Sequence, residues 1–139
     1  MSTKILNFGP WTYYLNFTNN KAPHFTDKVG KWMYFFDDKQ KAMKLCKEAV
    51  QNNIVLEAKH SNAPTGVACF YLNGDDIKNH KKVIQFFLDN DMIRKTKSGR
   101  LYNISFKFDK QTDAHLYGKD FKGTIKLDQF IDLNTGEFL

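Results

Sequence analysis

The four histidines are the first residues to consider for chemistry, because imidazole serves both as a metal ligand and as a general acid or base near neutral pH. They are widely spaced along the chain, and His80 lines up with Ile77 and Ile84 on a predicted helix, where we expect a packed, hydrogen-bonded histidine. No His lies three or four residues from another His or Cys, and no CxxC sequence occurs. These spacings do not predict a zinc site, and we expect no metal or other cofactor.

Sequence motifs for phosphate chemistry are incomplete. His24 and Thr26 form an HxT sequence that resembles half of the signature of two-histidine phosphodiesterases, but His60 and His115 lack a Ser or Thr two places on. Neither of the common glycine-rich phosphate loops is present. The sequence therefore favours a non-enzymatic protein; the catalytic alternative is a phosphodiester-processing enzyme that uses His60 and Asp109.

Positive charge is concentrated near the middle of the chain. The chain has 21 Lys and Arg residues against 15 acidic residues, a formal net charge of +6, and a pI near 9.2. Between residues 94 and 107 five basic residues occur, and the first acid to follow is Asp109. Such a surface attracts anionic partners, namely nucleotides, nucleic acid or acidic protein. The alternative is a solvated lysine-rich face without a ligand.

Two lysines fall on the polar faces of predicted strands. Lys59 and Lys107 each alternate with apolar neighbours, so we expect them to converge on one anion together with Ser61 or Ser105 if the two polar faces coincide. Arg94 and Arg100 could frame the same anion from a loop.

Aromatic residues could supply a stacking surface beside these lysines. Trp11 and Trp32 are candidates for stacking on a base, a contact worth about 1 to 3 kcal/mol. Core packing is the alternative for both, since Trp32 lies in an apolar run. Tyr13 and Tyr14 point to opposite faces of one predicted strand, so only one of them can join a given site.

Periodicity predicts the elements that must position these residues. Apolar residues at helical spacing, each following a candidate Asp N-cap (Asp37 or Asp38, and Asp75 or Asp76), predict helices over residues 38–53 and 76–91. Alternating or continuous apolar runs predict strands over residues 11–17, 31–36, 54–61, 67–72 and 101–108. Residues 121–133 are expected to form one more strand, or a strand and a helical turn.

This element order predicts a single α+β domain over residues 1–139. We expect a curved, mostly antiparallel sheet of about six strands with two helices packed on one face, leaving the other face for a ligand. Cys46 and Cys69 fall in apolar patterns rather than in a disulfide framework. Without an apolar signal segment or a membrane-length run, we expect a cytoplasmic protein and no membrane partner.

Three short segments resemble a known family. GKWM at 30–33, AKHS at 58–61 and FKFDKQT at 106–112 are similar to the GKWM, AKVS and YKPDxYT segments of the basophilic leukaemia-expressed proteins. The resemblance implies a fold like that of translation initiation factor 4E, a curved antiparallel sheet backed by helices, which holds a nucleotide cap with tryptophans and basic residues. The matched positions are Lys31, Trp32, Lys59, Ser61, Lys107, Asp109 and Thr112.

The leading hypothesis from the sequence is a binding protein for a phosphate-bearing nucleotide or a short nucleic acid. One form of it is a virus-encoded protein that sequesters a nucleotide signal. The alternative is a protein-interaction module or inhibitor that binds an acidic partner through the same basic face. The candidate ligand-binding residues are Lys59, Lys107, Trp32, Trp11, Ser61, Arg94, Arg100, Asp109 and His60.

Overall fold

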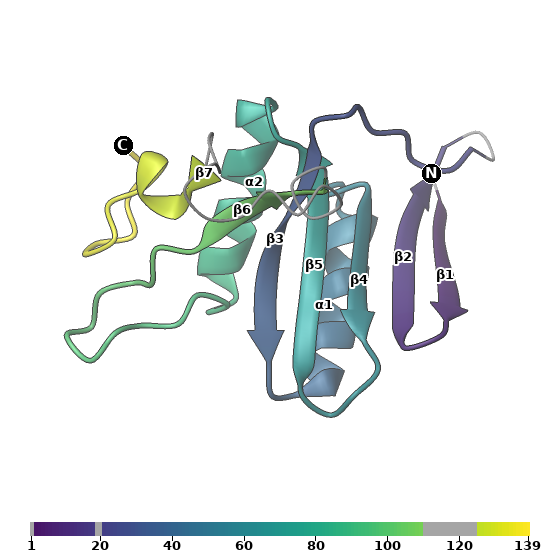
Figure 1. The fold of residues 1–139 in the computed structure, drawn as a ribbon, viewed down its shortest axis with the longest axis horizontal. Coiled ribbons are helices and arrows are strands. Elements are labelled where there is room, and N and C mark those ends of the chain that lie inside the picture. Colours follow the sequence, from purple (N-terminus) through teal and green to yellow (C-terminus); the bar gives the residue numbers. More distant parts are fainter. Residues whose placement is uncertain (1, 19–20, 110–124) are drawn as a thin grey trace.

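A computed structural model describes residues 2–18, 21–109 and 125–139, and it shows an open antiparallel sheet with two helices (Figure 1). The sheet is built from β1 (Ser2–Phe8), β2 (Trp11–Phe17), β3 (Val29–Phe36), β4 (Glu57–Ser61), β5 (Gly66–Asn73), β6 (Ser105–Phe108) and β7 (Ile125–Lys126). The helices are α1 (Lys39–Gln51), α2 (Ile77–Asp89) and the short 3-10 helix η2 (Leu127–Gln129). The α+β class predicted from the sequence is confirmed.

The spatial order of the strands, β1-β2-β4-β5-β3-β6-β7, differs from their order along the chain. As a result β3 lies in the interior of the sheet, between β5 and β6, although it follows β2 in sequence. This arrangement places segments that are distant in the sequence side by side on one face.

The sheet has seven strands rather than the expected six or so, because residues 2–8 form an additional strand. All seven residues of β1 pair with β2. Gly9 has a φ of +62°, and this left-handed conformation lets the chain reverse tightly into β2. The C-terminal expectation of a strand followed by a helical turn is confirmed by β7 and η2.

Both helices begin at an aspartate that was a candidate cap. The side chain of Asp38 accepts a hydrogen bond from the backbone N–H of Lys41, and Asp76 does the same for Asn79. Each bond satisfies one of the N–H groups left unpaired at a helix start. The helices therefore begin where the sequence predicts.

The two helices cover one face of the sheet, here called the covered face, and the opposite face is called the open face (Figure 1). In β2 the residues Thr12, Tyr14 and Asn16 are buried on the covered face. Trp11 and Tyr13, on the open face, are half-buried. The more aromatic side of β2 is thus the side that faces away from α1 and α2.

A buried polar pair lies within the core of the covered face. Trp32 Nε1 donates a 3.0 Å hydrogen bond to His80 Nδ1, and His80 Nε2 donates a 2.8 Å bond to the carbonyl oxygen of Gly74. Burial, the largest influence, lowers the pKa of His80, which favours the neutral imidazole that this bonding pattern needs. The expectation of a packed, hydrogen-bonded His80 is confirmed.

The structure also shows the state of the cysteines and the character of the helices. Cys46 and Cys69 are both buried with free thiols. Among the described residues, neither helix is both long enough and apolar enough to cross a membrane.

Candidate functional site

A row of residues in register crosses the open face of five adjacent strands. Cα pairing joins Leu15 to Glu57, Glu57 to Tyr71, Tyr71 to Lys31, and Lys31 to Lys107. Residues that pair directly in antiparallel strands point to the same face. The row therefore places two lysines, one carboxyl group and one phenol ring on a single surface.

Lys59 forms the centre of a cation–aromatic cluster next to this row. Its Nζ lies 4.1 Å from the centroid of the Trp11 ring, 5.6 Å from that of Tyr13 and 5.9 Å from that of Tyr71. Separations below about 6 Å are attractive because the face of an aromatic ring carries partial negative charge. The indole of Trp11 is consequently held beside an ammonium group on the open face.

Lys31 is a second cation on the open face, on the other side of β5 from Lys59. Its Nζ lies 5.6 Å from the Tyr71 centroid, so Tyr71 has an ammonium group from each neighbouring strand near its ring. Lys31 also forms a 2.7 Å ion pair with Asp109, and its side chain is only 14% exposed. A phosphate that reached Lys31 would compete with the carboxylate of Asp109.

The polar faces that carry Lys59 and Lys107 coincide, which the sequence left as a condition. However, β4 and β6 are three strand positions apart in the sheet. At about 4.8 Å per position, their backbones are separated by roughly 14 Å. Lys31 lies on a strand between them, and a single anion shared by Lys59 and Lys107 stays a prediction.

Reasoning from residue types alone did not select Lys31, although the family resemblance includes it. The signal is the alternation in β3, where Lys31 and Met33 point away from the side that buries Trp32 and Tyr34. A lysine at such a position in a largely apolar strand marks the face that the helices leave open. The pairing partner of that strand could not be deduced from this signal.

Trp32 and His60 are not part of the open-face surface, and both assignments from the sequence are wrong. Trp32 is 0% exposed and His60 is 1% exposed, because both side chains point to the covered face. His60 Nε2 lies 3.1 Å from the hydroxyl oxygen of Tyr14. His60 is thereby separated by the sheet from Asp109, which pairs with Lys31, so the structure does not assemble that catalytic pair.

The remaining candidates are dispersed. Ser61 shares the open face with Lys59, but its Oγ accepts a 3.1 Å hydrogen bond from the backbone N–H of Val67. Arg94 donates to the carbonyl oxygen of Phe35, which is four residues from Lys31 along β3. Arg100 is exposed in the loop after α2, and Thr112 lies outside the described residues.

Burial alters the titration of the acidic groups on the open face. Desolvation by burial, the largest effect, raises the pKa of Glu57, and Asp109 raises it further while Lys59 opposes the change. Burial also raises the pKa of Tyr71, so its phenol remains neutral. With Glu57 ionised, the surface of Lys31, Lys59 and Lys107 has three ammonium groups and two carboxylates.

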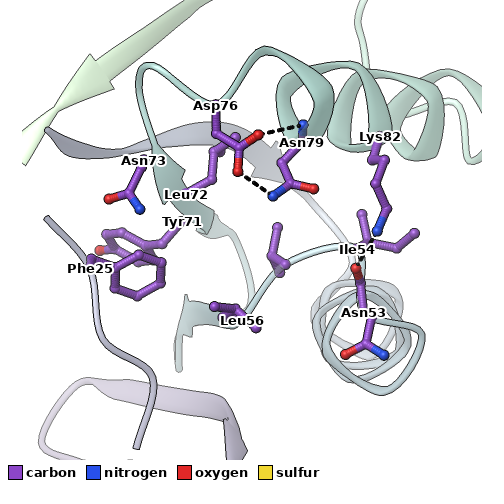
Figure 2. A pocket seen from close by; sticks show the side chains of 11 residues that line it. Phe25, Asn53, Ile54, Leu56, Tyr71, Leu72, Asn73, Asp76, Asn79 and Lys82 are labelled. Carbon is purple, nitrogen blue, oxygen red and sulfur yellow. Dashed lines mark hydrogen bonds between the residues drawn. The ribbon is translucent and has the colours of Figure 1, made fainter.

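A pocket of about 300 Å³ opens at one end of the sheet (Figure 2). Phe25 and Tyr71 both line it, and polar side chains at the start of α2 line it as well. These polar groups already bond to one another: Asp76 accepts from Asn79, and Lys82 donates to the carbonyl oxygen of Asn53. The pocket therefore offers a ligand mainly apolar surface.

No group of three or more His, Cys, Asp or Glu residues in the described ranges has the geometry to hold a metal ion. Comparison with protein-family models, with curated proteins and with solved structures yields no match to this chain. The family resemblance of the three short segments therefore stays a prediction.

Proposed function

We propose that the open face binds a short single-stranded nucleic acid without catalysing a reaction. The observation that carries this proposal is the pair of Lys59 and Trp11 on the open face, where Lys59 Nζ lies 4.1 Å from the centroid of the half-buried indole. Lys31 Nζ extends the cationic surface, 5.6 Å from the centroid of the buried Tyr71 ring. Single-stranded nucleic acids are bound by grooves that combine positive charge along the backbone with aromatic rings beneath the bases.

The spacing of the lysines favours an oligonucleotide over a mononucleotide. Lys59, Lys31 and Lys107 lie on three different strands across the sheet. Their backbones span roughly 14 Å, and a chain with several phosphates can contact all three lysines along this line. Trp11 and Tyr13 provide aromatic surface at one end of this line, beside Lys59.

The same geometry favours nucleic-acid binding over the two alternative functions, an acidic-protein partner and a phosphodiester-processing enzyme. An acidic protein could also contact the three lysines, but the rings of Trp11, Tyr13 and Tyr71 next to them favour a partner that has planar bases. A phosphodiester-processing enzyme that relies on His60 and Asp109 has no support, since these residues lie on opposite faces.

The proposal can be tested by fluorescence polarisation with labelled oligo(dT) and oligo(U) of about ten nucleotides. Lys59→Gln and Lys107→Gln should each weaken binding several-fold, and Trp11→Ala should weaken it by at least fivefold through loss of stacking. Lys81→Gln is the matched control, because Lys81 is exposed on α2 behind the sheet. Equal affinities for the control and the open-face variants would refute the site.

Salt dependence supplies a second criterion. If three lysines neutralise phosphates, the logarithm of the association constant should fall with the logarithm of salt concentration with a slope of about −2. Each lysine removed should reduce the slope by about 0.7. Binding that does not respond to salt would exclude phosphate contacts as its source.

A further inference from the structure

A second surface with an excess of cations lies on the covered face, away from the proposed oligonucleotide site. It is a groove of about 550 Å³ between the β1–β2 hairpin and α1. Lys39, Lys44 and Lys47 line it from α1, and none of its described lining residues is acidic. The nearest carboxylate that contacts these lysines is that of Glu48, which lies 3.9 Å from Lys44 Nζ in an exposed pair.

The floor of the groove is neutral and buried. His60 Nδ1 lies 3.0 Å from the carbonyl oxygen of Ser61, which can only accept, so Nδ1 carries the proton and Nε2 accepts from the hydroxyl of Tyr14. Burial lowers the pKa of His60 and raises the pKa of Tyr14 to about 12. The charge of the groove therefore comes from its lysine wall.

Two amide groups lie at the mouth of the groove. The hydroxyl oxygen of Thr12 lies 2.8 Å from the side-chain amide of Asn7 and 2.7 Å from that of Asn62. Because a hydroxyl has one proton, Thr12 donates to one amide oxygen and accepts from the NH₂ of the other amide, which leaves one amide NH₂ as a donor for a ligand. Ammonium and amide N–H groups together suit a ligand rich in carboxylate oxygens.

The groove is bordered by an edge strand. β1 pairs only with β2 among the described strands, and it forms one margin of the sheet (Figure 1). Its outer N–H and C=O groups are therefore available for an added strand. Ile5, which lines the groove, is 48% exposed and offers an apolar contact there.

The lysine spacing matches an extended chain. Eight residues of α1 separate Lys39 from Lys47, a rise of about 12 Å. In a strand, side chains on one face recur every second residue, and four residues span about 13 Å. Three acidic residues at alternate positions would therefore meet the three lysines.

We propose that this groove binds an acidic polypeptide segment in extended conformation, which pairs with the free edge of β1 and turns alternate Asp or Glu side chains toward Lys39, Lys44 and Lys47. This site is separate from the open face, so the absence of oligonucleotide binding would not count against it.

The test uses the full chain and a fluorescein-labelled peptide of alternating Glu and Val, about ten residues long, in fluorescence polarisation. A peptide of the same composition with its Glu and Val residues in two separate blocks is the first control. A peptide with N-methyl groups on one backbone edge is the second, because it keeps the charge but cannot add to β1. The alternating peptide should bind more tightly than either control.

Protein variants locate the contact. The combined change of Lys39→Gln, Lys44→Gln and Lys47→Gln should weaken the peptide roughly tenfold, as expected for three partly exposed ion pairs. A second protein with Lys78→Gln, Lys81→Gln and Lys97→Gln loses the same charge elsewhere and should retain affinity. Circular dichroism is the control that both variants are folded.

Several results would overturn the proposal. They are equal binding of the alternating and block peptides, equal binding of the N-methylated peptide, equal loss in the two triple variants, or no binding at all. Weaker oligo(dT) binding in the groove variant but not in its control would also overturn it, by assigning the groove to nucleic acid.

Discussion

Lys59 Nζ lies 4.1 Å from the centroid of the Trp11 indole, which places a cation beside an aromatic ring on the open face. The two residues belong to paired strands, β2 and β4, and both are half-buried. Two tyrosines complete the surroundings of the same ammonium group. This arrangement makes the open face both cationic and aromatic at one position.

Lys59→Gln should destabilise the protein by about 1 kcal/mol, because an exposed to half-buried cation–π contact contributes roughly 0.5 to 1 kcal/mol. Urea unfolding followed by circular dichroism measures this change. The emission of Trp11 should also shift when the ammonium group is removed. Lys97→Gln, in an exposed loop, is the control; an equal effect of both substitutions would argue against the contact.

Glu57→Gln should increase oligonucleotide affinity at pH 7, because it removes a carboxylate beside Tyr71 and Lys59. The pKa of Glu57 is raised chiefly by burial, so the native state retains the proton at a pH where the unfolded chain has lost it. Affinity of the original protein should therefore rise as pH falls toward the raised pKa. The Glu57→Gln variant should show a flatter profile in polarisation titrations, and an unchanged profile would assign the pH dependence to another group.

Stability should decrease as pH falls below about 6.5, the ordinary pKa of histidine. The pKa of His80 is lowered in the folded state mainly by burial, so the unfolded chain binds more protons between the two values and stability rises with pH. The contribution is fully present above about pH 6.5 and is lost as pH drops through the lowered value. Burial lowers the pKa of His60 as well, in the same direction.

His80→Gln should flatten part of this dependence, since an amide can still accept from Trp32 and donate to Gly74. Urea unfolding at several pH values between 5 and 8 measures the slope. His24→Gln is the control, because His24 is exposed. A slope that His80→Gln leaves intact would contradict the role assigned to this buried pair.

Gly30→Ala should destabilise the protein by about 1 to 3 kcal/mol, the usual effect of overpacking. A Cβ at this position would lie 2.6 Å from the carbonyl oxygen of Lys107 and 2.6 Å from the ring of Phe106. β6 would have to move away from β3, which shifts Lys107 relative to Lys31. Thermal unfolding should show the loss, and oligonucleotide affinity should fall in the same variant; a neutral result would mean that β6 does not approach β3 as closely as described.

The sequence by itself determined the local features of this protein. The helix starts at Asp38 and Asp76 and the alternation of β2 were predictable, because caps and two-residue periodicity depend on neighbours along the chain. The buried role of His80 followed from its position on the apolar face of a helix. These features need no knowledge of distant contacts.

Only the tertiary structure decided which residues meet. Strand alternation shows that Trp11 and Thr12 face opposite sides, but the packing of α1 decides that the side of Thr12 is covered. The insertion of β3 between β5 and β6 places Lys31 between Lys59 and Lys107 and moves Trp32 into the core. Pairing between strands far apart in sequence depends on how the whole core is filled, and a local pattern does not encode that.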